Sequence, residues 1–180
     1  MPTTVRRMKR QLELRRHTDN DGDSLTPEGV RAALEIGARL SGGYDVAVST
    51  GAQRATQTLA CFLAALGERV PGGVTVEPGL RSRVEDRWRA AYEEADSGTL
   101  EALRRADPEL VEEDSAVLAA ALRRILDQLR DGGRALIVGH SPTNEAAVFG
   151  VTGEEVPPLA KGAGVLVTAE GPGFSVETLD

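Results

Sequence analysis

Residues 135–142 read Ala-Leu-Ile-Val-Gly-His-Ser-Pro, and this stretch decides the fold class of the 180-residue chain. Four consecutive apolar residues are typical of a central parallel strand that is covered on both faces. Ser141 is a good N-cap residue and Pro142 suits the first helical position, so we expect a helix to begin directly after the strand. A strand that leads straight into a helix is the building unit of an α/β sheet.

The rest of the chain repeats this alternation. Leu12 and Leu14 alternate with polar residues and predict a first strand over 11–16, and Thr26-Pro27 repeats the cap-plus-proline helix start, with an expected end at Gly42. Further strands are predicted at 45–49, 74–76, 165–167 and 174–176, helices over 55–66 and 118–129, and short helices within the charged stretch 81–105. We therefore expect one α/β domain over residues 1–180, with three layers and a mostly parallel central sheet flanked by helices.

Charge and cysteine content narrow the classes of function. The net charge of −7 argues against general binding to nucleic acid or to anionic membranes. Cys61 is the single cysteine, so no intramolecular disulfide and no cysteine-based zinc cage can form, and a reducing, cytoplasmic location is expected. The basic stretch 6–10 is not followed by the apolar region of a signal peptide, and no run approaches the roughly 20 apolar residues of a membrane span. Residues 1–10 are therefore expected to form a basic N-terminal arm.

Both histidines of the chain follow predicted strands. His17 comes after Arg16 at the end of the first strand, and His140 comes with Gly139 at the end of the apolar strand 135–138. Arg54 falls in or near the first turn of the helix after Ser49. The carboxyl ends of parallel strands form the usual ligand site of such sheets, and arginine forks beside a helix N-terminus bind phosphate oxygens. One histidine at a strand end is more often structural, and Arg16 alone could pair with a surface acid. Four such residues at equivalent places favour an anion pocket.

These residues carry a resemblance to a known family. Residues 14–18 (LRRHT) resemble the Leu-x-Arg-His-Gly signature of the histidine phosphatase superfamily, also called phosphoglycerate mutase-like, and residues 25–29 (LTPEG) resemble its LTxxG helix start. Residues 48–58 (VSTGAQRATQT) resemble its second arginine motif, and residues 137–141 (IVGHS) its second histidine motif. The four motifs occur in the family's order between residues 12 and 150. The short chain, without a large cap insertion, is more similar to the small phosphohistidine-phosphatase branch than to sugar-phosphate mutases.

The resemblance implies a phosphoglycerate mutase-like fold and a two-step phosphoryl transfer. His17 would attack phosphorus to form a phosphohistidine, and Arg16, Arg54 and His140 would bind the phosphoryl oxygens. Thr18 and Asn20, just beyond the nucleophile, are further candidates for substrate binding. The implied substrate is a phosphorylated small molecule or a phosphoprotein, and neither a metal nor a cofactor is required.

Two departures from the family pattern concern the pocket. Thr18 stands where the family usually has Gly or Ala, and Ser82 stands where its proton-donating Glu is expected. Glu85, in the predicted lid segment, is the favoured replacement donor. The alternatives are Glu77, Asp19 and Asp21.

Two other functions compete with that of a phosphatase. One is a phosphoglycerate-type mutase, which the missing acid disfavours, and the other is a non-catalytic module that binds phospho-ligands. The run 19–23 (DNDGD) hints at a calcium loop, but its Gly comes too early, so a polar turn is expected. Trp88 and Tyr92, one helical turn apart, are expected to be packing residues at the sheet edge, with substrate contact as the alternative.

Overall fold

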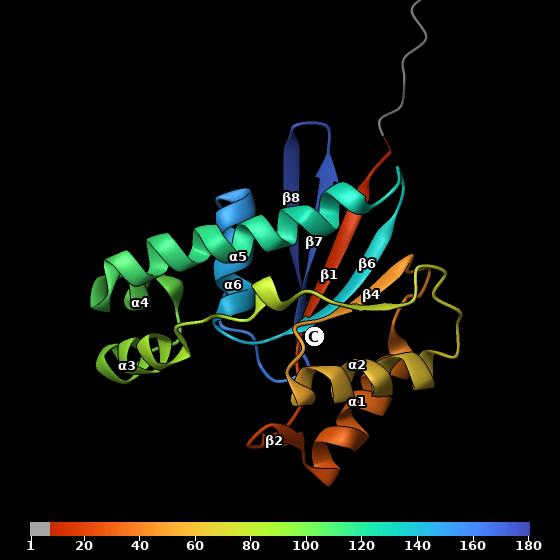
Figure 1. The fold of residues 1–180 in the computed structure, drawn as a ribbon, viewed down its shortest axis with the longest axis horizontal. Coiled ribbons are helices and arrows are strands. Elements are labelled where there is room, and N and C mark those ends of the chain that lie inside the picture. Colours follow the sequence, from red (N-terminus) through yellow and green to blue (C-terminus); the bar gives the residue numbers. More distant parts are fainter. Residues whose placement is uncertain (1–7) are drawn as a thin grey trace, which may run out of the picture.

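The computed structural model describes residues 8–180, and its centre is a six-stranded sheet in the order β5-β4-β6-β1-β7-β8 (Figure 1). The strands of this sheet are β1 (Arg10–Arg16), β4 (Val46–Ser49), β5 (Val74–Val76), β6 (Arg134–Gly139), β7 (Gly164–Glu170) and β8 (Gly173–Leu179). The helices are α1 (Pro27–Arg39), α2 (Gln53–Leu66), α3 (Glu85–Ala95), α4 (Leu100–Ala106), α5 (Pro108–Gln128) and α6 (Thr143–Thr152), with a short 3-10 turn η1 (Pro78–Leu80). A small hairpin joins β2 (Asn20–Asp21) to β3 (Ser24–Leu25).

Strand direction places three strand ends together. β5, β4, β6 and β1 run parallel to one another, whereas β7 and β8 add antiparallel pairs at one side. Arg16 lies opposite Gly139 in the register of β1 and β6, and Ser49 lies opposite Val138 in that of β4 and β6. The chain segments that follow these strands therefore leave the sheet at the same edge, side by side. The predicted three-layer, mostly parallel α/β architecture is confirmed.

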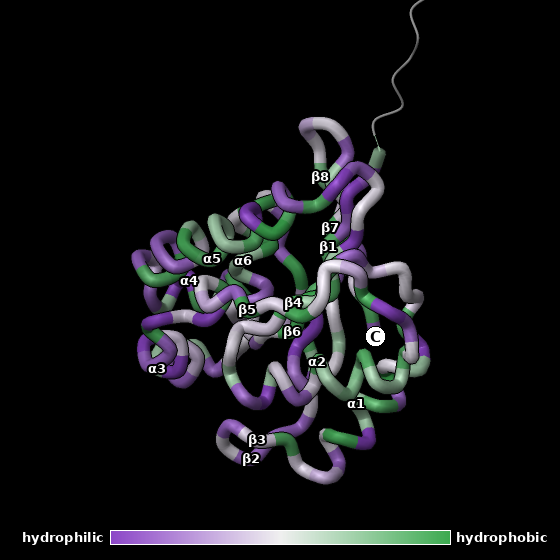
Figure 2. The backbone as a smooth tube through the Cα atoms, turned by 45° about the vertical axis from the view of Figure 1, so that its right-hand side comes forward, coloured by the Kyte–Doolittle hydropathy of each residue, from purple (hydrophilic) through white to green (hydrophobic). Residues whose placement is uncertain are grey.

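Helices cover both faces of the sheet. Successive side chains of a strand point to opposite faces, so the apolar strands place apolar side chains on both faces. Leu136 and Val138 of β6 pack against α1 and α2, while Ile137 packs on the other face among residues of α5 and α6. Leu12 and Leu14 of β1 also face the α5 and α6 side. Figure 2 shows that α3, in contrast, is mostly hydrophilic along its length.

The start of α1 explains part of the sequence pattern. The side chain of Thr26 accepts a hydrogen bond from the N–H of Gly29, and Pro27 occupies the first turn. A Cβ at Gly29 would lie 2.0 Å from the carbonyl oxygen of Asp19. Gly29 therefore lets the loop after β1 pack directly on the helix, which holds the chain beyond His17 in place.

Two expectations at element ends are wrong. The helix after β6 begins at Thr143 with Pro142 in the N-cap position, and Ser141 donates its hydroxyl to Glu145 instead of capping the helix. Arg10, assigned to the N-terminal arm, is the first residue of β1, while residues 1–7 of that arm lie outside the described residues.

Candidate active site

His17 follows β1, and its ring has one defined hydrogen bond. Nδ1 lies 2.8 Å from the carbonyl oxygen of Thr18, which can only accept, so Nδ1 carries the proton and Nε2 carries the lone pair. The side chain is 6% exposed. Burial lowers the pKa of His17 to about 4; the bond to Thr18 opposes this shift, and the charges of Arg54 and Arg16 add to it. At neutral pH the ring is therefore uncharged, with a free nitrogen available for attack.

Thr18 orients this histidine but faces inward. Its hydroxyl donates to the carbonyl of Gly29 at 2.8 Å, and its N–H donates to Oγ1 of Thr58 at 3.2 Å. The side chain predicted to contact substrate is thus buried against α1 and α2. The geometry does not support that contact, and it gives Thr18 the task of fixing the carbonyl that holds His17.

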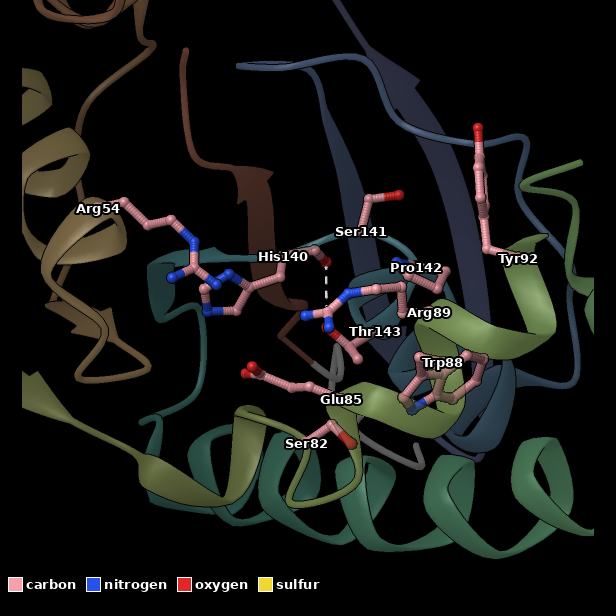
Figure 3. A pocket seen from close by; sticks show the side chains of 10 residues that line it. All are labelled: Arg54, Ser82, Glu85, Trp88, Arg89, Tyr92, His140, Ser141, Pro142 and Thr143. Carbon is pink, nitrogen blue, oxygen red and sulfur yellow. Dashed lines mark hydrogen bonds between the residues drawn. The ribbon is translucent and has the colours of Figure 1, made fainter. Parts of the chain in front are cut away.

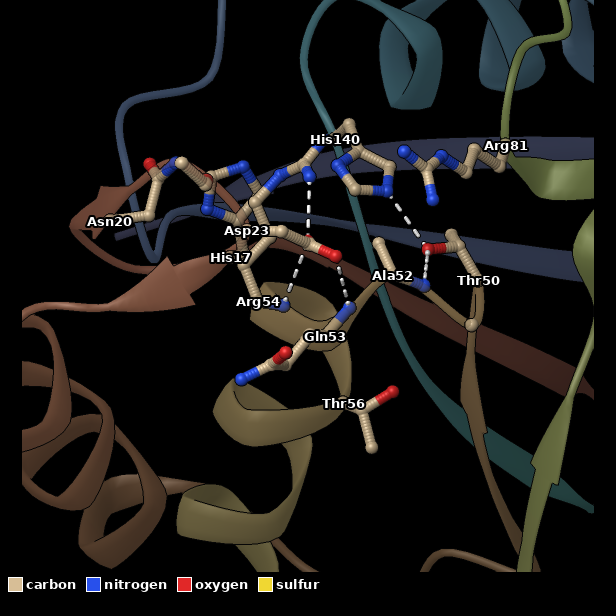
Figure 4. Close-up of polar contacts among 12 residues, drawn as sticks. His17, Asn20, Asp23, Thr50, Ala52, Gln53, Arg54, Thr56, Arg81 and His140 are labelled. Carbon is tan, nitrogen blue, oxygen red and sulfur yellow. Dashed lines mark hydrogen bonds and ion pairs between the residues drawn. The ribbon is translucent and has the colours of Figure 1, made fainter.

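His140 follows β6 and lies beside His17. The two ring centroids are 5.4 Å apart with an interplanar angle of 61°. Nε2 of His140 shares a 2.8 Å hydrogen bond with Oγ1 of Thr50, the residue after β4, and Nδ1 is buried with no hydrogen-bond partner within residues 8–180 (Figure 4). Burial lowers the pKa of His140 to about 3, and the charges of Arg54, His17 and Arg81 add to the shift. Both histidines are therefore neutral at physiological pH.

Arg54 is held by an acid from the β2–β3 hairpin. Its Nη1 donates to Oδ1 of Asp23 at 2.8 Å, and the same carboxylate accepts the backbone N–H groups of Arg54 and Gln53 (Figure 4). Ala52, at the N-cap of α2, has no side chain that could cap the helix, so Asp23 does so from outside. The sequence analysis missed Asp23, because the acidic run 19–23 gave no sign of which carboxylate reaches α2.

Arg16 is anchored by the segment between α6 and β7. Its Nη1 donates to the carbonyl of Leu159 at 2.8 Å, and the N–H of Leu159 donates to Oε1 of the buried Glu145. Burial lowers the pKa of Arg16, and the nearby charges of Glu145 and Tyr92 oppose that shift. Burial also raises the pKa of Glu145. Glu145 was missed as well, although an acid directly before the apolar run 146–151 was a usable signal.

A pocket of about 250 Å³ opens beside His140 and Arg54 (Figure 3). It is lined by Arg54, Ser82, Glu85, Trp88, Arg89, Tyr92, His140, Ser141, Pro142 and Thr143. These residues come from α2, from the η1–α3 segment and from the β6–α6 turn. The pocket therefore joins the arginine and histidine site to the first two turns of α3.

Ser82 does not replace the missing acid. Its hydroxyl donates to Oδ2 of the buried Asp114 at 2.7 Å, and its oxygen accepts the N–H of Val84 at 3.1 Å. The proton of Ser82 is thus already committed to a carboxylate. Asp114 belongs to the core-facing side of α5, and the sequence analysis did not single it out.

Among the four candidate donors, Glu85 lines the pocket. Its Oε1 accepts a 2.8 Å hydrogen bond from Nε of Arg81. Glu77 instead accepts from Gly79 and Arg124 around η1.

The hairpin acids and Asn20 have partners of their own. Asp19 accepts from Lys161 and Thr26. Asn20 donates to the carbonyl of Gly22 and accepts from Lys161, so its substrate contact stays a prediction. Asp21 is exposed in the same hairpin.

Two further searches covered the residues that the structure describes. Within residues 8–180 no group of three or more His, Cys, Asp or Glu side chains is arranged to hold a metal ion. No helix in that range is long and apolar enough to cross a membrane. Cys61 is partly buried on α2, and burial raises the pKa of its thiol, as expected of a packing residue.

Comparisons with known proteins agree with this geometry. The sequence model of the histidine phosphatase superfamily (branch 1) matches residues 5–162, and the chain belongs to this superfamily. No curated protein matches the chain in sequence. Among solved structures, phosphoglycerate mutase from Bacillus anthracis is similar with a TM-score of 0.73 and 16% identity, over 97% of this chain and 94% of that one.

Two phosphatases have the same fold. Phosphoserine phosphatase from Entamoeba histolytica, solved with 3-phosphoglyceric acid, is similar with a TM-score of 0.71 and 16% identity, over 95% of this chain and 97% of that one. The protein histidine phosphatase SixA, solved with tungstate, has a TM-score of 0.58 and 19% identity, over 94% of this chain and 96% of that one. Because the score is higher for the mutase than for SixA, backbone likeness does not itself select the small phosphohistidine-phosphatase branch.

Proposed function

We propose that this protein is a phosphatase that hydrolyses a phosphomonoester or phosphoramidate through a phosphohistidine on His17, without a metal ion. The observation that carries the proposal is the defined tautomer of His17. Its Nδ1–H is held by the carbonyl of Thr18, so Nε2 is unprotonated, next to Arg16, Arg54 and His140. A neutral imidazole held in one orientation is the form that attacks phosphorus.

The first step transfers the phosphoryl group to the enzyme. Nε2 of His17 forms a bond to phosphorus while the bond from phosphorus to the leaving oxygen or nitrogen breaks, and the leaving group takes that electron pair. Arg16 and Arg54 offer guanidinium donors to the phosphoryl oxygens, and His140 lies beside them. Stabilising the developing charge by positioned donors is the main source of rate acceleration in this reaction class.

The second step returns the enzyme to its starting state. Water attacks phosphorus, the bond from phosphorus to Nε2 breaks, and the nitrogen regains its lone pair as inorganic phosphate leaves. A general base removes the proton of the water, and a general acid protonates the leaving group in the first step. Glu85, which lines the pocket, is the residue we assign to this proton transfer.

A cytoplasmic location and a phosphorylated small molecule or phosphoprotein as substrate complete the proposal. The single cysteine supports the location, and the open pocket beside the arginines supports the substrate class. The commitment of Ser82 to Asp114 argues against a mutase that depends on an acid at this position.

A turnover assay tests the proposal. Purified protein should release inorganic phosphate from a chromogenic aryl phosphate, and phosphate release should exceed the formation of the isomer 2-phosphoglycerate when 3-phosphoglycerate is supplied. A protein that binds phosphate without releasing it from any substrate would be the non-catalytic module. Isomerisation without phosphate release would identify a mutase.

A further inference from the structure

One face of α3 forms a wall of the pocket. Glu85, Trp88, Arg89 and Tyr92 all line it, and positions three, four and seven apart lie on the same side of a helix. Pro142 and Thr143, at the start of α6, line it as well (Figure 3). The wall therefore brings two aromatic rings and a proline ring to a pocket that also contains His140 and Arg54.

Trp88 is fixed in this wall by a buried network. Its Nε1 donates to Oδ2 of Asp114 at 2.6 Å, and the same oxygen accepts the hydroxyl of Ser82. The indole is 3% exposed and packs in the core that contains α5. A side chain held in this way is a rigid surface for a ligand and loses little conformational freedom on binding.

Tyr92 supplies the uncovered part of the wall. Tyr92 is 52% exposed, so much of the apolar surface of its ring is free to be buried against a ligand. A Cβ at Gly98 would lie 3.4 Å from Cε2 of the ring, so the ring edge rests beside this glycine.

We propose that α3 forms a leaving-group subsite for a planar aromatic ring, so that the substrates are aryl phosphates, including the phosphotyrosine side chain. This inference rests on the proposed phosphatase function. The phosphoryl group would bind at His17 and the two arginines, and the ring would lie in the pocket between the α3 wall and Pro142. Aromatic rings stacked in this way add to the binding that burial alone provides.

The chemistry of the leaving group agrees with the pocket. When the bond from phosphorus to the aryl oxygen breaks, the electron pair stays on oxygen as a phenolate, whose conjugate acid has a pKa near 10. An alkoxide is a much stronger base and needs a proton during bond cleavage. Ser82 stands where the family has an acid, and its hydroxyl already donates a hydrogen bond to Asp114, so the site is suited to the weaker base.

Binding of phosphonates tests the subsite independently of turnover. Calorimetry with the full chain compares phenylphosphonate with methylphosphonate for wild type, Tyr92→Ala, Tyr92→Phe and the control Glu93→Ala, an exposed α3 residue that does not line the pocket. We expect Tyr92→Ala to weaken phenylphosphonate about fivefold and methylphosphonate less than twofold, with Tyr92→Phe and Glu93→Ala near wild type. Equal binding of the two ligands by wild type, or equal weakening of both by Tyr92→Ala, would overturn the inference.

Kinetics separate this inference from the proposed function and identify the source of the ring. Absence of turnover on every phosphate ester, with the phenylphosphonate preference retained, would reject the phosphatase and keep the subsite as a binding site. With turnover, the KM for free phosphotyrosine should rise in Tyr92→Ala while that for an alkyl phosphate stays constant. If a phosphotyrosyl peptide is turned over with a kcat/KM comparable to that of free phosphotyrosine, the substrate is a phosphoprotein. If the peptide is excluded from the pocket, the substrate is a small aryl phosphate.

Discussion

The carboxylate of Asp23 and the guanidinium of Arg54 are joined at 2.8 Å, and the backbone N–H of Arg54 donates to the same Oδ1 at 3.2 Å. Asp23 thereby fixes both the start of α2 and the direction of the arginine side chain. Burial opposes ionisation of Asp23, but hydrogen bonds from the backbone and side chain of Arg54 and from Gln53 lower its pKa overall. The acid is therefore charged at neutral pH, and it positions the guanidinium that we propose to bind the phosphoryl group.

Replacing Asp23 should weaken catalysis through Arg54. We expect Asp23→Ala to lower kcat/KM about tenfold and to lower the free energy of unfolding by about 1 kcal/mol, because both the ion pair and the cap of α2 are lost. Asp23→Asn keeps an oxygen that can accept the N–H groups, so it should recover most of the stability but not the activity. Steady-state kinetics and denaturant unfolding measure the two effects.

The control for this pair is Glu28→Gln, an exposed acid in the first turn of α1 that pairs with Arg31. It should leave both quantities unchanged. Unaltered kcat/KM in both Asp23 variants would show that Arg54 is positioned without this carboxylate.

Removing His17, the proposed nucleophile, should abolish turnover and leave the fold intact. His17 follows the last residue of β1, and its ring makes its hydrogen bond to a neighbouring carbonyl, so His17→Ala removes no long-range side-chain hydrogen bond among the described residues. We expect no detectable phosphate release and no acid-labile phosphoenzyme after incubation with radiolabelled substrate, with a near-UV circular dichroism spectrum like that of wild type. Residual turnover near the wild-type rate, or labelling that persists, would remove His17 from its assigned role.

The positions of these groups show what the sequence could predict. His17, Arg16, Arg54 and His140 were singled out because each ends or follows a strand, or lies at the start of the helix after one, and parallel strands bring such positions to one edge. The strands themselves followed from short apolar runs, and α1 from Thr26-Pro27. The local sequence pattern was sufficient to predict an element wherever the contacts that define that element lie within one helical turn or one strand.

The partners of these groups could not be predicted in the same way. Asp114 reaches Ser82 across 32 residues, and Asp23 reaches Arg54 across 31. Such contacts depend on how the β2–β3 hairpin and α5 pack in three dimensions, which no periodicity in one segment encodes. Ser141 shows the same limit, because its hydroxyl bonds to Glu145 and not to the helix end that its position suggested.

The two histidines should make stability fall with acid. The pKa of His17 is lowered to about 4 and that of His140 to about 3, so the folded protein stays unprotonated at these rings while the unfolded chain binds protons below about 6.5. The free energy of unfolding is therefore fully retained above pH 6.5 and decreases below it, down to about pH 4 for His17 and to about pH 3 for His140, with His17 contributing on the order of 3 kcal/mol. Urea unfolding at pH 7 and pH 4.5 measures this difference.

A His17 variant and an NMR titration test whether the histidines cause this loss of stability in acid. His17→Ala should lose less stability than wild type across the same pH interval. NMR titration of the ring protons should show both histidines neutral at pH 5. A histidine that titrates near 6.5 in the folded protein would contradict the lowered pKa, and an equal pH dependence in the variant would assign the effect to other groups.

The last prediction concerns proton donation to the leaving group. Figure 3 shows the carboxylate of Glu85 directed toward Arg54 and His140, while Arg81 holds its Oε1. A placed acid typically contributes a factor of 10²–10⁴, and that help matters most when the leaving group is a strong base. We expect wild type to turn over aryl phosphates faster than alkyl phosphates at matched concentrations. Glu85→Gln should then lose roughly 10²-fold on alkyl phosphates and little on aryl phosphates.

Glu93→Gln, on the exposed side of the same helix, is the matched control and should behave as wild type on both substrates. Equal losses on aryl and alkyl phosphates in Glu85→Gln would indicate a role in binding or in holding Arg81, because a proton donor must discriminate between leaving groups. No loss on either substrate would exclude Glu85. The proton would then come from Glu77, Asp19, Asp21 or water, and the hairpin acids could be tested by the same comparison of substrates.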